Sequence, residues 1–184
     1  MKRLNLSLTR LSATLLLAGV LGACGSQDPQ ELIASAREHL QKNDNATAII
    51  ELKNALQEQN NLPEARLLLG QALLAHGDPV GAEAELRKAR EQNHKPDEVS
   101  PLLARAWLAQ GQARKVTEAF DQVRLESPQA QAALLTSLAI AWRAEGKMET
   151  FRQRLAAALQ LPPEYAPALL ERARLQAADR QFNA

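Results

Sequence analysis

Cysteine, aromatic residues and net charge are all scarce in this 184-residue chain. Its single cysteine, Cys24, excludes a disulfide within the chain. Aromatic residues make up only 3% of the sequence, and valine, isoleucine, threonine and tyrosine, which favour strands, are few. The formal net charge is +1 and no basic run is interleaved with aromatic residues, so the composition gives no reason to expect nucleic acid as a partner.

Motifs for catalysis and cofactor binding are missing as well. The sequence contains neither a glycine-rich phosphate loop nor a nucleophile elbow. The three histidines, His39, His76 and His94, do not stand four residues apart, as a helical metal-binding pair would. We therefore predict a non-enzymatic protein without a metal or cofactor. Trp107 and Trp142 recur in one column of the repeat described below, which favours core positions over sugar-stacking platforms.

The residues that dominate are alanine, leucine, glutamine, glutamate and arginine, all good helix formers. Hydrophobic residues account for 46% of the chain. This composition predicts an all-α domain.

The first 24 residues have the organisation of a signal segment. Residues 1–10 carry three basic side chains and no acidic one. Residues 11–20 are apolar, about as long as the hydrophobic part of a signal peptide and too short to span a bilayer comfortably. The run then ends in "LGAC", at Cys24. This pattern resembles the lipobox of bacterial lipoproteins; the alternative is an incidental cysteine beside an ordinary signal or an N-terminal anchor helix.

The lipobox resemblance implies a location. Residues 1–23 would be a signal peptide cleaved before Cys24, and residues 24–28 would be the acylated cysteine and a short tether. Two or three acyl chains anchor a protein stably to a membrane. Gly25 stands where Gram-negative lipoproteins retained at the inner membrane tend to carry aspartate. The resemblance therefore implies a lipid anchor in the outer membrane, on its periplasmic face.

A period of 34 or 35 residues runs through the rest of the chain. A turn column consists of Asn43, Gly77, Gly111 and Gly146, and a column of small residues upstream of it consists of Ala36, Gly70, Ala104 and Ala139. Three downstream columns keep the same register: Ala48, Ala82, Val116 and Phe151; Leu52, Leu86, Phe120 and Leu155; Ala55, Ala89, Val123 and Ala158.

This period is the length of the tetratricopeptide repeat, which the chain resembles. The resemblance implies an all-α solenoid of helical hairpins wound into a right-handed superhelix, each hairpin containing a helix A and a helix B. We expect four repeats at about 29–62, 63–96, 97–130 and 132–165, followed by a partial repeat at 166–184. The expected helices span roughly 30–42, 45–59, 63–76, 79–92, 98–110, 113–125, 132–145, 148–160 and 165–180.

The columns also predict packing. Small residues in helix A let helix B of the same unit approach closely, and Gly77 and its equivalents supply the tight turn. Val116 and Phe151 are larger than the usual alanine, so the later repeats should cross at altered angles. Pro101 and Pro128 are expected at the junctions between helices. The last segment is either a polar capping helix or one end of a longer array, and we expect the longer array.

Ligand contacts in tetratricopeptide domains come from the concave face formed by the A helices. The resemblance maps that face onto Arg37, Gln71, Arg105, Ile140 and Arg174. Arginines in a row could bind carboxylate or phosphate groups through two hydrogen bonds each, which suits an extended anionic peptide or polymer. The alternative is a merely solvated helical surface. Apolar contact beside the arginines is expected from Leu67, Leu74 and Leu108.

The lipobox together with "AREHLQKNDNATAIIELKNALQEQNNLPEARLLLGQALLAHGD" and "AEAELRKA" resembles the tetratricopeptide lipoproteins of the PEP-CTERM/exosortase system. That resemblance implies a periplasmic scaffold that binds an envelope protein in exopolysaccharide export or protein sorting. The alternative is a pilotin-like or outer-membrane assembly lipoprotein. Whether a sugar or a protein is recognised stays open at this point.

Overall fold

The structure is a computed structural model that describes residues 28–182, with side chains as far as Ala178. The predicted signal segment 1–23, Cys24 and tether residues 25–27 lie outside the described residues. Within residues 28–182 the chain forms nine α-helices and no strand. They are α1 (Pro29–Gln41), α2 (Asn45–Glu58), α3 (Pro63–His76), α4 (Pro79–Glu91), α5 (Pro96–Ala109), α6 (Ala113–Phe120), α7 (Pro128–Ala144), α8 (Met148–Leu159) and α9 (Ala166–Phe182).

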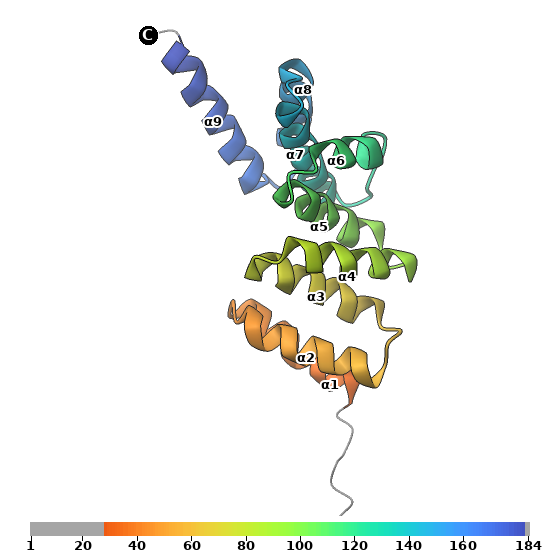
Figure 1. Cartoon of the computed structure of the whole chain (residues 1–184). Coiled ribbons are helices and arrows are strands. Elements are labelled where there is room, and N and C mark those ends of the chain that lie inside the picture. Colours follow the sequence, from red (N-terminus) through yellow and green to blue (C-terminus); the bar gives the residue numbers. More distant parts are fainter. Residues whose placement is uncertain (1–27, 183–184) are drawn as a thin grey trace, which may run out of the picture.

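The helices form four consecutive hairpins, α1–α2, α3–α4, α5–α6 and α7–α8, followed by α9 (Figure 1). We call the odd-numbered helices A helices and the even-numbered helices B helices. Successive A helices contact one another along the whole stack, from α1 to α9. The predicted all-α fold of stacked helical hairpins is confirmed.

The turns inside the hairpins depend on left-handed backbone. The turn column lies at positive φ throughout, at 58° for Asn43, 89° for Gly77, 73° for Gly111 and 79° for Gly146. Asparagine and glycine are the residues that adopt this conformation most readily. In the first two hairpins an aspartate then caps helix B, because the carboxylates of Asp44 and Asp78 accept hydrogen bonds from the backbone N–H groups of Thr47 and Gly81.

The column of small residues lies at the contact between helix A and helix B. Ala36, Ala104 and Ala139 are fully buried. A Cβ atom added to Gly70 would lie 2.5 Å from Cγ of Leu86, a fully buried residue of α4. No side chain fits at Gly70 without moving Leu86, so the close approach of α3 and α4 depends on glycine. The downstream small positions Ala48, Ala82 and Ala89 are also fully buried.

The later hairpins depart from the arrangement of the first two. In Figure 1, α7 and α8 run steeply across the direction of α1 to α4. Val116 and Phe151, which replace the usual alanine, are both fully buried. Their larger side chains occupy the space where an alanine would let neighbouring helices pack more closely.

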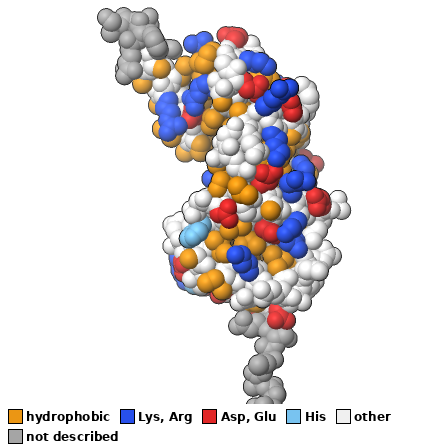
Figure 2. All heavy atoms as spheres, viewed as in Figure 1, with side chains coloured by type: hydrophobic (Ala, Val, Ile, Leu, Met, Phe, Trp, Pro, Cys, Tyr) orange, Lys and Arg blue, Asp and Glu red, His pale blue; other side chains and the backbone are white. Residues whose placement is uncertain are grey.

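Charged side chains of both signs are interspersed on the face shown in Figure 2. Among the described helices, none combines the length and apolar character that crossing a membrane requires.

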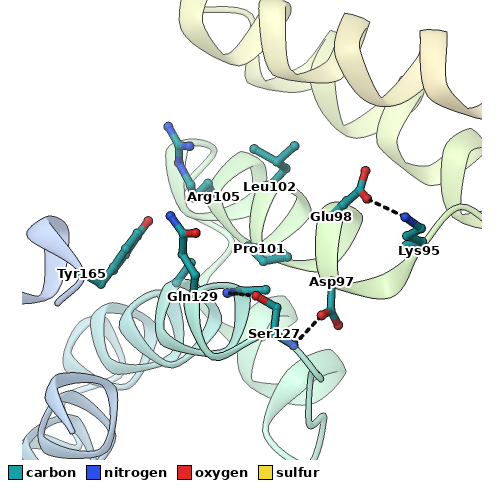
Figure 3. A pocket seen from close by; sticks show the side chains of 11 residues that line it. Lys95, Asp97, Glu98, Pro101, Leu102, Arg105, Ser127, Gln129 and Tyr165 are labelled. Carbon is teal, nitrogen blue, oxygen red and sulfur yellow. Dashed lines mark hydrogen bonds and ion pairs between the residues drawn. The ribbon is translucent and has the colours of Figure 1, made fainter. Parts of the chain in front are cut away.

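The connection between α6 and α7 differs from the prediction. Helix α6 ends at Phe120 rather than at residue 125, and α7 begins at Pro128 rather than at residue 132. The carboxylate of Asp97, on α5, accepts a hydrogen bond from the backbone N–H of Ser127 at 2.6 Å (Figure 3). It also accepts one from the backbone N–H of Glu126 at 3.1 Å. These amides therefore bond to a side chain instead of continuing a helix, and Ser127 then caps α7.

The prediction for Pro101 was wrong, because it lies inside α5 and not at a junction. Helix α5 begins at Pro96, two residues before the predicted start. Pro101 falls in the second turn, where its missing N–H removes a single helical hydrogen bond, and its ring is buried.

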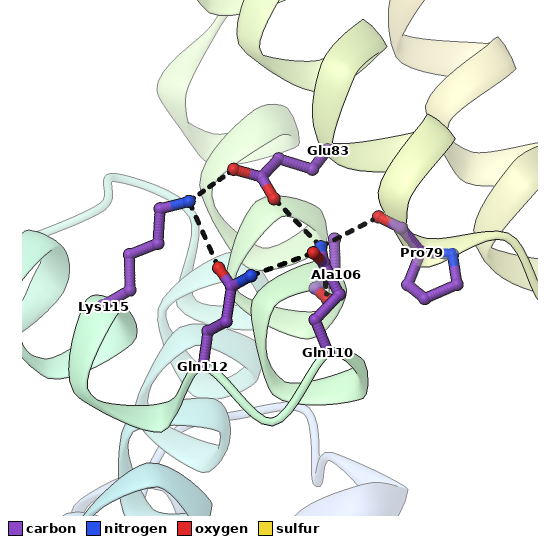
Figure 4. A network of polar contacts seen from close by, with 6 residues as sticks. All are labelled: Pro79, Glu83, Ala106, Gln110, Gln112 and Lys115. Atoms are coloured by element: carbon purple, nitrogen blue, oxygen red, sulfur yellow. Dashed lines mark hydrogen bonds and ion pairs between the residues drawn. The ribbon is translucent and has the colours of Figure 1, made fainter.

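A polar network holds the C-terminal end of α5 against α4 and α6 (Figure 4). Nε2 of Gln110 donates to the Pro79 carbonyl oxygen at 3.1 Å and to Oε2 of Glu83 at 2.9 Å. Nζ of Lys115 donates to Oε1 of Glu83 at 2.5 Å. Gln112 closes the network by donating to Gln110 and accepting from Lys115. Glu83 thus joins three helices from the second and third hairpins.

Burial works against the charge of Glu83, whose side chain is 13% exposed. Burial alone would raise the pKa of this carboxyl, but hydrogen bonds from Lys115 and Gln110 lower it below its ordinary value. The indole N–H of Trp107 also lowers this pKa, although its geometry falls short of a hydrogen bond. The folded chain therefore favours the ionised form of Glu83.

We expect Gly70→Leu to lower the free energy of unfolding by about 1–3 kcal/mol, because the new side chain overlaps Leu86. Thermal and urea unfolding followed by circular dichroism measure the loss. Leu86→Ala should cost about 2–5 kcal/mol on its own. The double variant should cost less than the sum of the two, since the space left by Leu86 accepts the new leucine. Strict additivity would contradict a direct contact at this position.

We expect Glu83→Gln to lower the free energy of unfolding at pH 7 by about 1.5–3 kcal/mol, because it removes the charged partner of Lys115 and Gln110. The folded-state pKa of Glu83 is lowered, so its contribution is present above the ordinary pKa of 4.5 and is lost as the pH falls through the folded-state value. Urea unfolding at a series of pH values should show the difference between variant and wild type shrinking below pH 4.5.

Glu91 provides the matched control, since it lies on the same helix, is exposed, and makes no hydrogen bond or ion pair with the described residues. Glu91→Gln should leave stability nearly unchanged at every pH. Equal pH dependence in the two variants would show that the network does not perturb Glu83.

Candidate functional site

Three hollows follow one another along the A helices. The first, which we call the Gln71 hollow, lies between α1 and α3 and has a volume of about 260 Å³. Its lining residues are Arg37, Leu40, Gln41, Leu68 and Gln71. The other two hollows lie farther along the stack.

The second, the Leu108 hollow, has a volume of about 470 Å³ and draws its walls from α3, α5, α7 and the start of α9. It contains one charged side chain, Arg105, and no carboxylate. The remaining lining is formed by Leu74, Leu108, Ala109, Ala133, Thr136, Ser137, Ile140, Tyr165 and Pro167.

The third, the Gln129 hollow, lies between α5 and α7 and has a volume of about 510 Å³. Arg105, Ala133 and Tyr165 border both this hollow and the Leu108 hollow, so the two are adjacent. Figure 3 shows the side chains of Arg105, Gln129 and Tyr165 pointing into the same space. The rest of the lining is Lys95, Asp97, Glu98, Pro101, Leu102, Ser127 and Ala130.

We refer to the three hollows together as the A-helix groove. The structure brings Arg37 and Gln71 together in the Gln71 hollow. Arg105 and Ile140 lie in the next part of the groove. Arg174 lines none of these hollows. Four of the five positions predicted on the concave face therefore border the groove, in two groups.

Arg37 and Arg174 differ from the expected free arginines, because each already pairs with a carboxylate. Arg37 forms an ion pair with Glu64 at the start of α3. Arg174 donates to Glu171, one turn earlier on α9, at 2.5 Å. The same glutamate, only 4% exposed, also accepts from Arg143 of α7 at 2.6 Å. Arg174 thus helps to neutralise a buried carboxylate that joins α9 to α7.

Of the three arginines predicted on the concave face, Arg105 is the one that stays available to a ligand. Its side chain is exposed, and it forms no ion pair or hydrogen bond with the described part of the chain. The two carboxylates of the Gln129 hollow are occupied elsewhere. Asp97 accepts the two backbone N–H groups of the α6–α7 connection. Glu98 contacts Nε2 of His94 at 2.8 Å, a contact that lowers the pKa of Glu98.

Sequence reasoning missed Gln129 and Tyr165, which share the space around Arg105. Tyr165 is the only tyrosine in the chain and directly precedes α9, yet no repeat column includes it.

The prediction that Leu67 contacts a ligand beside the arginines was wrong, since that side chain is only 7% exposed and belongs to the core. Its neighbour Leu68 lines the Gln71 hollow instead, because one residue along a helix turns the side chain by about 100°.

The groove offers two guanidinium groups, an amine, two carboxylates, a phenol, amides and apolar side chains, a mixture that suits binding of a ligand. Among the described residues, no cluster of three or more histidine, cysteine, aspartate or glutamate side chains could hold a metal ion.

Comparison with known proteins agrees with this architecture. Residues 39–106 match the family model described as tetratricopeptide repeat. No curated protein matches the chain. Among solved structures, the chain is similar to YrrB, described as a TPR protein with an unusual peptide-binding site. The two share 12% sequence identity with a TM-score of 0.50, over 81% of this chain and 94% of YrrB.

The match to the family model and the likeness to YrrB agree with the hairpin stacking, the left-handed turns and the buried small column described above. The chain therefore has the tetratricopeptide-repeat fold, built from four helical hairpins and a ninth helix within its described residues.

Proposed function

We propose that this protein is a membrane-anchored adaptor of the periplasm that binds an extended polypeptide of a partner protein along its A-helix groove. The fold is that of a protein-interaction scaffold, and the Leu108 hollow carries the proposal. That hollow combines an apolar wall with one available arginine, on the face where the A helices line up.

The dimensions of the groove support an extended ligand. Its hollows draw on four successive A helices, α1, α3, α5 and α7, so a ligand that filled them would have to run across the helices. An extended chain rises about 3.3 Å per residue, and a segment of several residues could contact two hollows at once. YrrB, which shares the fold, is described as having a peptide-binding site, and this favours a peptide here as well.

The membrane anchor and the setting rest on sequence resemblance. The "LGAC" motif at Cys24 supports lipid attachment, and Gly25 supports delivery to the outer membrane. The similarity to the tetratricopeptide lipoproteins of the PEP-CTERM/exosortase system supports a role in exopolysaccharide export or protein sorting. In that setting the adaptor would hold a partner protein close to the membrane surface, because the tether before α1 is only a few residues long.

Site-specific photo-crosslinking in living cells tests the groove. A photoreactive residue in place of Gln71 should give discrete adducts with a partner polypeptide, because this side chain is exposed in the groove. The adducts are measured by electrophoresis and identified by mass spectrometry.

Arg87 is the control position for the same experiment, since it is exposed on the B helix α4 and lines none of the described hollows. We expect no specific adduct there. Adducts formed from Arg87 but not from Gln71 would place the partner on the other face and contradict the proposed function.

Cys24→Ser tests the anchor independently of the groove. The variant has no thiol to acylate, so we expect it to incorporate no fatty acid and to remain an unprocessed precursor. Metabolic labelling with a clickable fatty acid, followed by gel analysis of precursor and mature forms, measures both effects. Equal labelling of variant and wild type would show that Cys24 is not the attachment point.

A further inference from the structure

We propose that the groove selects a peptide in which an acidic side chain and an aliphatic one stand two residues apart, in either order. Arg105 binds the carboxylate, and the Leu108 hollow accepts the aliphatic side chain. This inference rests on the proposed function, since it names what the groove recognises in the polypeptide that it binds.

The charge of the site selects the acidic residue. The Leu108 hollow contains the guanidinium of Arg105 and no carboxylate, and Arg105 has no ion-pair partner among the described residues. Arg37 and Arg174, at equivalent positions, are already paired with Glu64 and Glu171. Arg105 can therefore pair with a carboxylate without breaking an internal contact. A guanidinium can form two parallel hydrogen bonds with a carboxylate, which makes such a pair strong and directional.

The walls of the hollow select the aliphatic residue. Leu74, Leu108 and Ile140 come from three different A helices and are each half-buried, so each presents part of an apolar side chain to the hollow. The hydroxyl groups of Thr136 and Ser137 are already used, since each donates to a carbonyl oxygen four residues earlier in α7. The hollow therefore offers apolar contact with little competition from free hydrogen-bonding groups.

The spacing follows from the geometry of an extended chain. Side chains of an extended peptide alternate in direction, so residues two apart face the same way and lie about 7 Å from each other. Arg105 borders the Leu108 hollow and also the adjacent Gln129 hollow. A carboxylate paired with Arg105 lies at the edge of the Leu108 hollow. A peptide that continues over this hollow, in either chain direction, therefore directs the side chain two residues away into it, and the intervening side chain points to solvent.

A peptide fits this site better than an acidic sugar polymer. The Leu108 hollow is lined mainly by aliphatic side chains, and the hydroxyls of Thr136 and Ser137 are already hydrogen-bonded, so few groups there can bind sugar hydroxyls. Tyr165 is the one aromatic side chain in the described lining, because both tryptophans are used in packing. Trp107 is only 3% exposed and stacks on Phe120 with ring centroids 5.3 Å apart. Trp142 lies under Nζ of Lys147, 4.2 Å from its ring centroid, and lines none of the three hollows of the groove.

The test measures binding of fluorescent nonapeptides to the purified mature protein by anisotropy. The first probe carries Glu-x-Leu in a serine and alanine background, the second carries Gln-x-Leu, and both are also made with the two residues in reverse order. We expect the glutamate probe to bind about tenfold more tightly, as a charge-assisted contact implies. In Arg105→Gln this preference should disappear. In Arg87→Gln, an exposed arginine outside the hollows, the preference should remain.

Two further probes test the spacing and the ligand class. A peptide with glutamate and leucine adjacent to each other should lose most of the advantage, because the two side chains then face opposite directions. Leu108→Ala should weaken binding of the Glu-x-Leu probe several-fold, while binding of a Glu-x-Ser probe should change little. A hexamer of uronic acid should not displace the peptide.

Several results would overturn the inference. These are equal affinity of wild type for the glutamate and glutamine probes, unchanged preference in Arg105→Gln, displacement by the uronic acid hexamer, or no binding of the glutamate probe in either residue order at millimolar concentration. Adducts at Gln71 in cells do not depend on the peptide sequence preferred by Arg105. Failure of this inference is therefore distinguishable from failure of the proposed function.

Discussion

The close contact between the two helices of each hairpin is the constraint on which the rest of the structure depends. In the second hairpin a Cβ atom at Gly70 would overlap Leu86, and in the other hairpins the equivalent small residues are fully buried. This contact lets each hairpin act as one thin layer, and stacking such layers brings the A helices side by side. The groove lies on the side of the stack where the A helices are next to one another. Its shape therefore depends on the contacts between A and B helices that position them.

Much of this fold could be predicted because its determinants are local and repeated. Small residues every 34 or 35 positions indicate the A–B contact, and glycine or asparagine at each turn indicates the reversal of the chain. The connection between α6 and α7 could not be predicted in the same way. Its conformation depends on Asp97, about 30 residues earlier, which bonds to two backbone amides. No repeat column indicates a contact of that kind.

The candidate site could be predicted only in outline, for a related physical reason. The repeat register pointed to Gln71 and Arg105, and the structure places both at hollows of the A-helix groove, whereas Arg174 lines none of these hollows. It could not indicate which arginines are free, because that depends on acidic residues at positions outside the columns. Glu64 forms an ion pair with Arg37 and Glu171 with Arg174, whereas none of the residues that the structure describes pairs with Arg105. Tyr165 joins the site because the start of α9 packs against α7 and borders the same hollow as Arg105.

Methyl nuclear magnetic resonance of the mature protein, titrated with the Glu-x-Leu peptide, tests most directly whether the A-helix groove is the binding face. The methyl groups of Leu74, Leu108 and Ile140 should shift, since they line the Leu108 hollow. Those of Ile50 and Val80, which are 60% and 65% exposed on the B helices α2 and α4, should not move. Shifts confined to Ile50 and Val80 would contradict recognition by the groove and assign it to the opposite face.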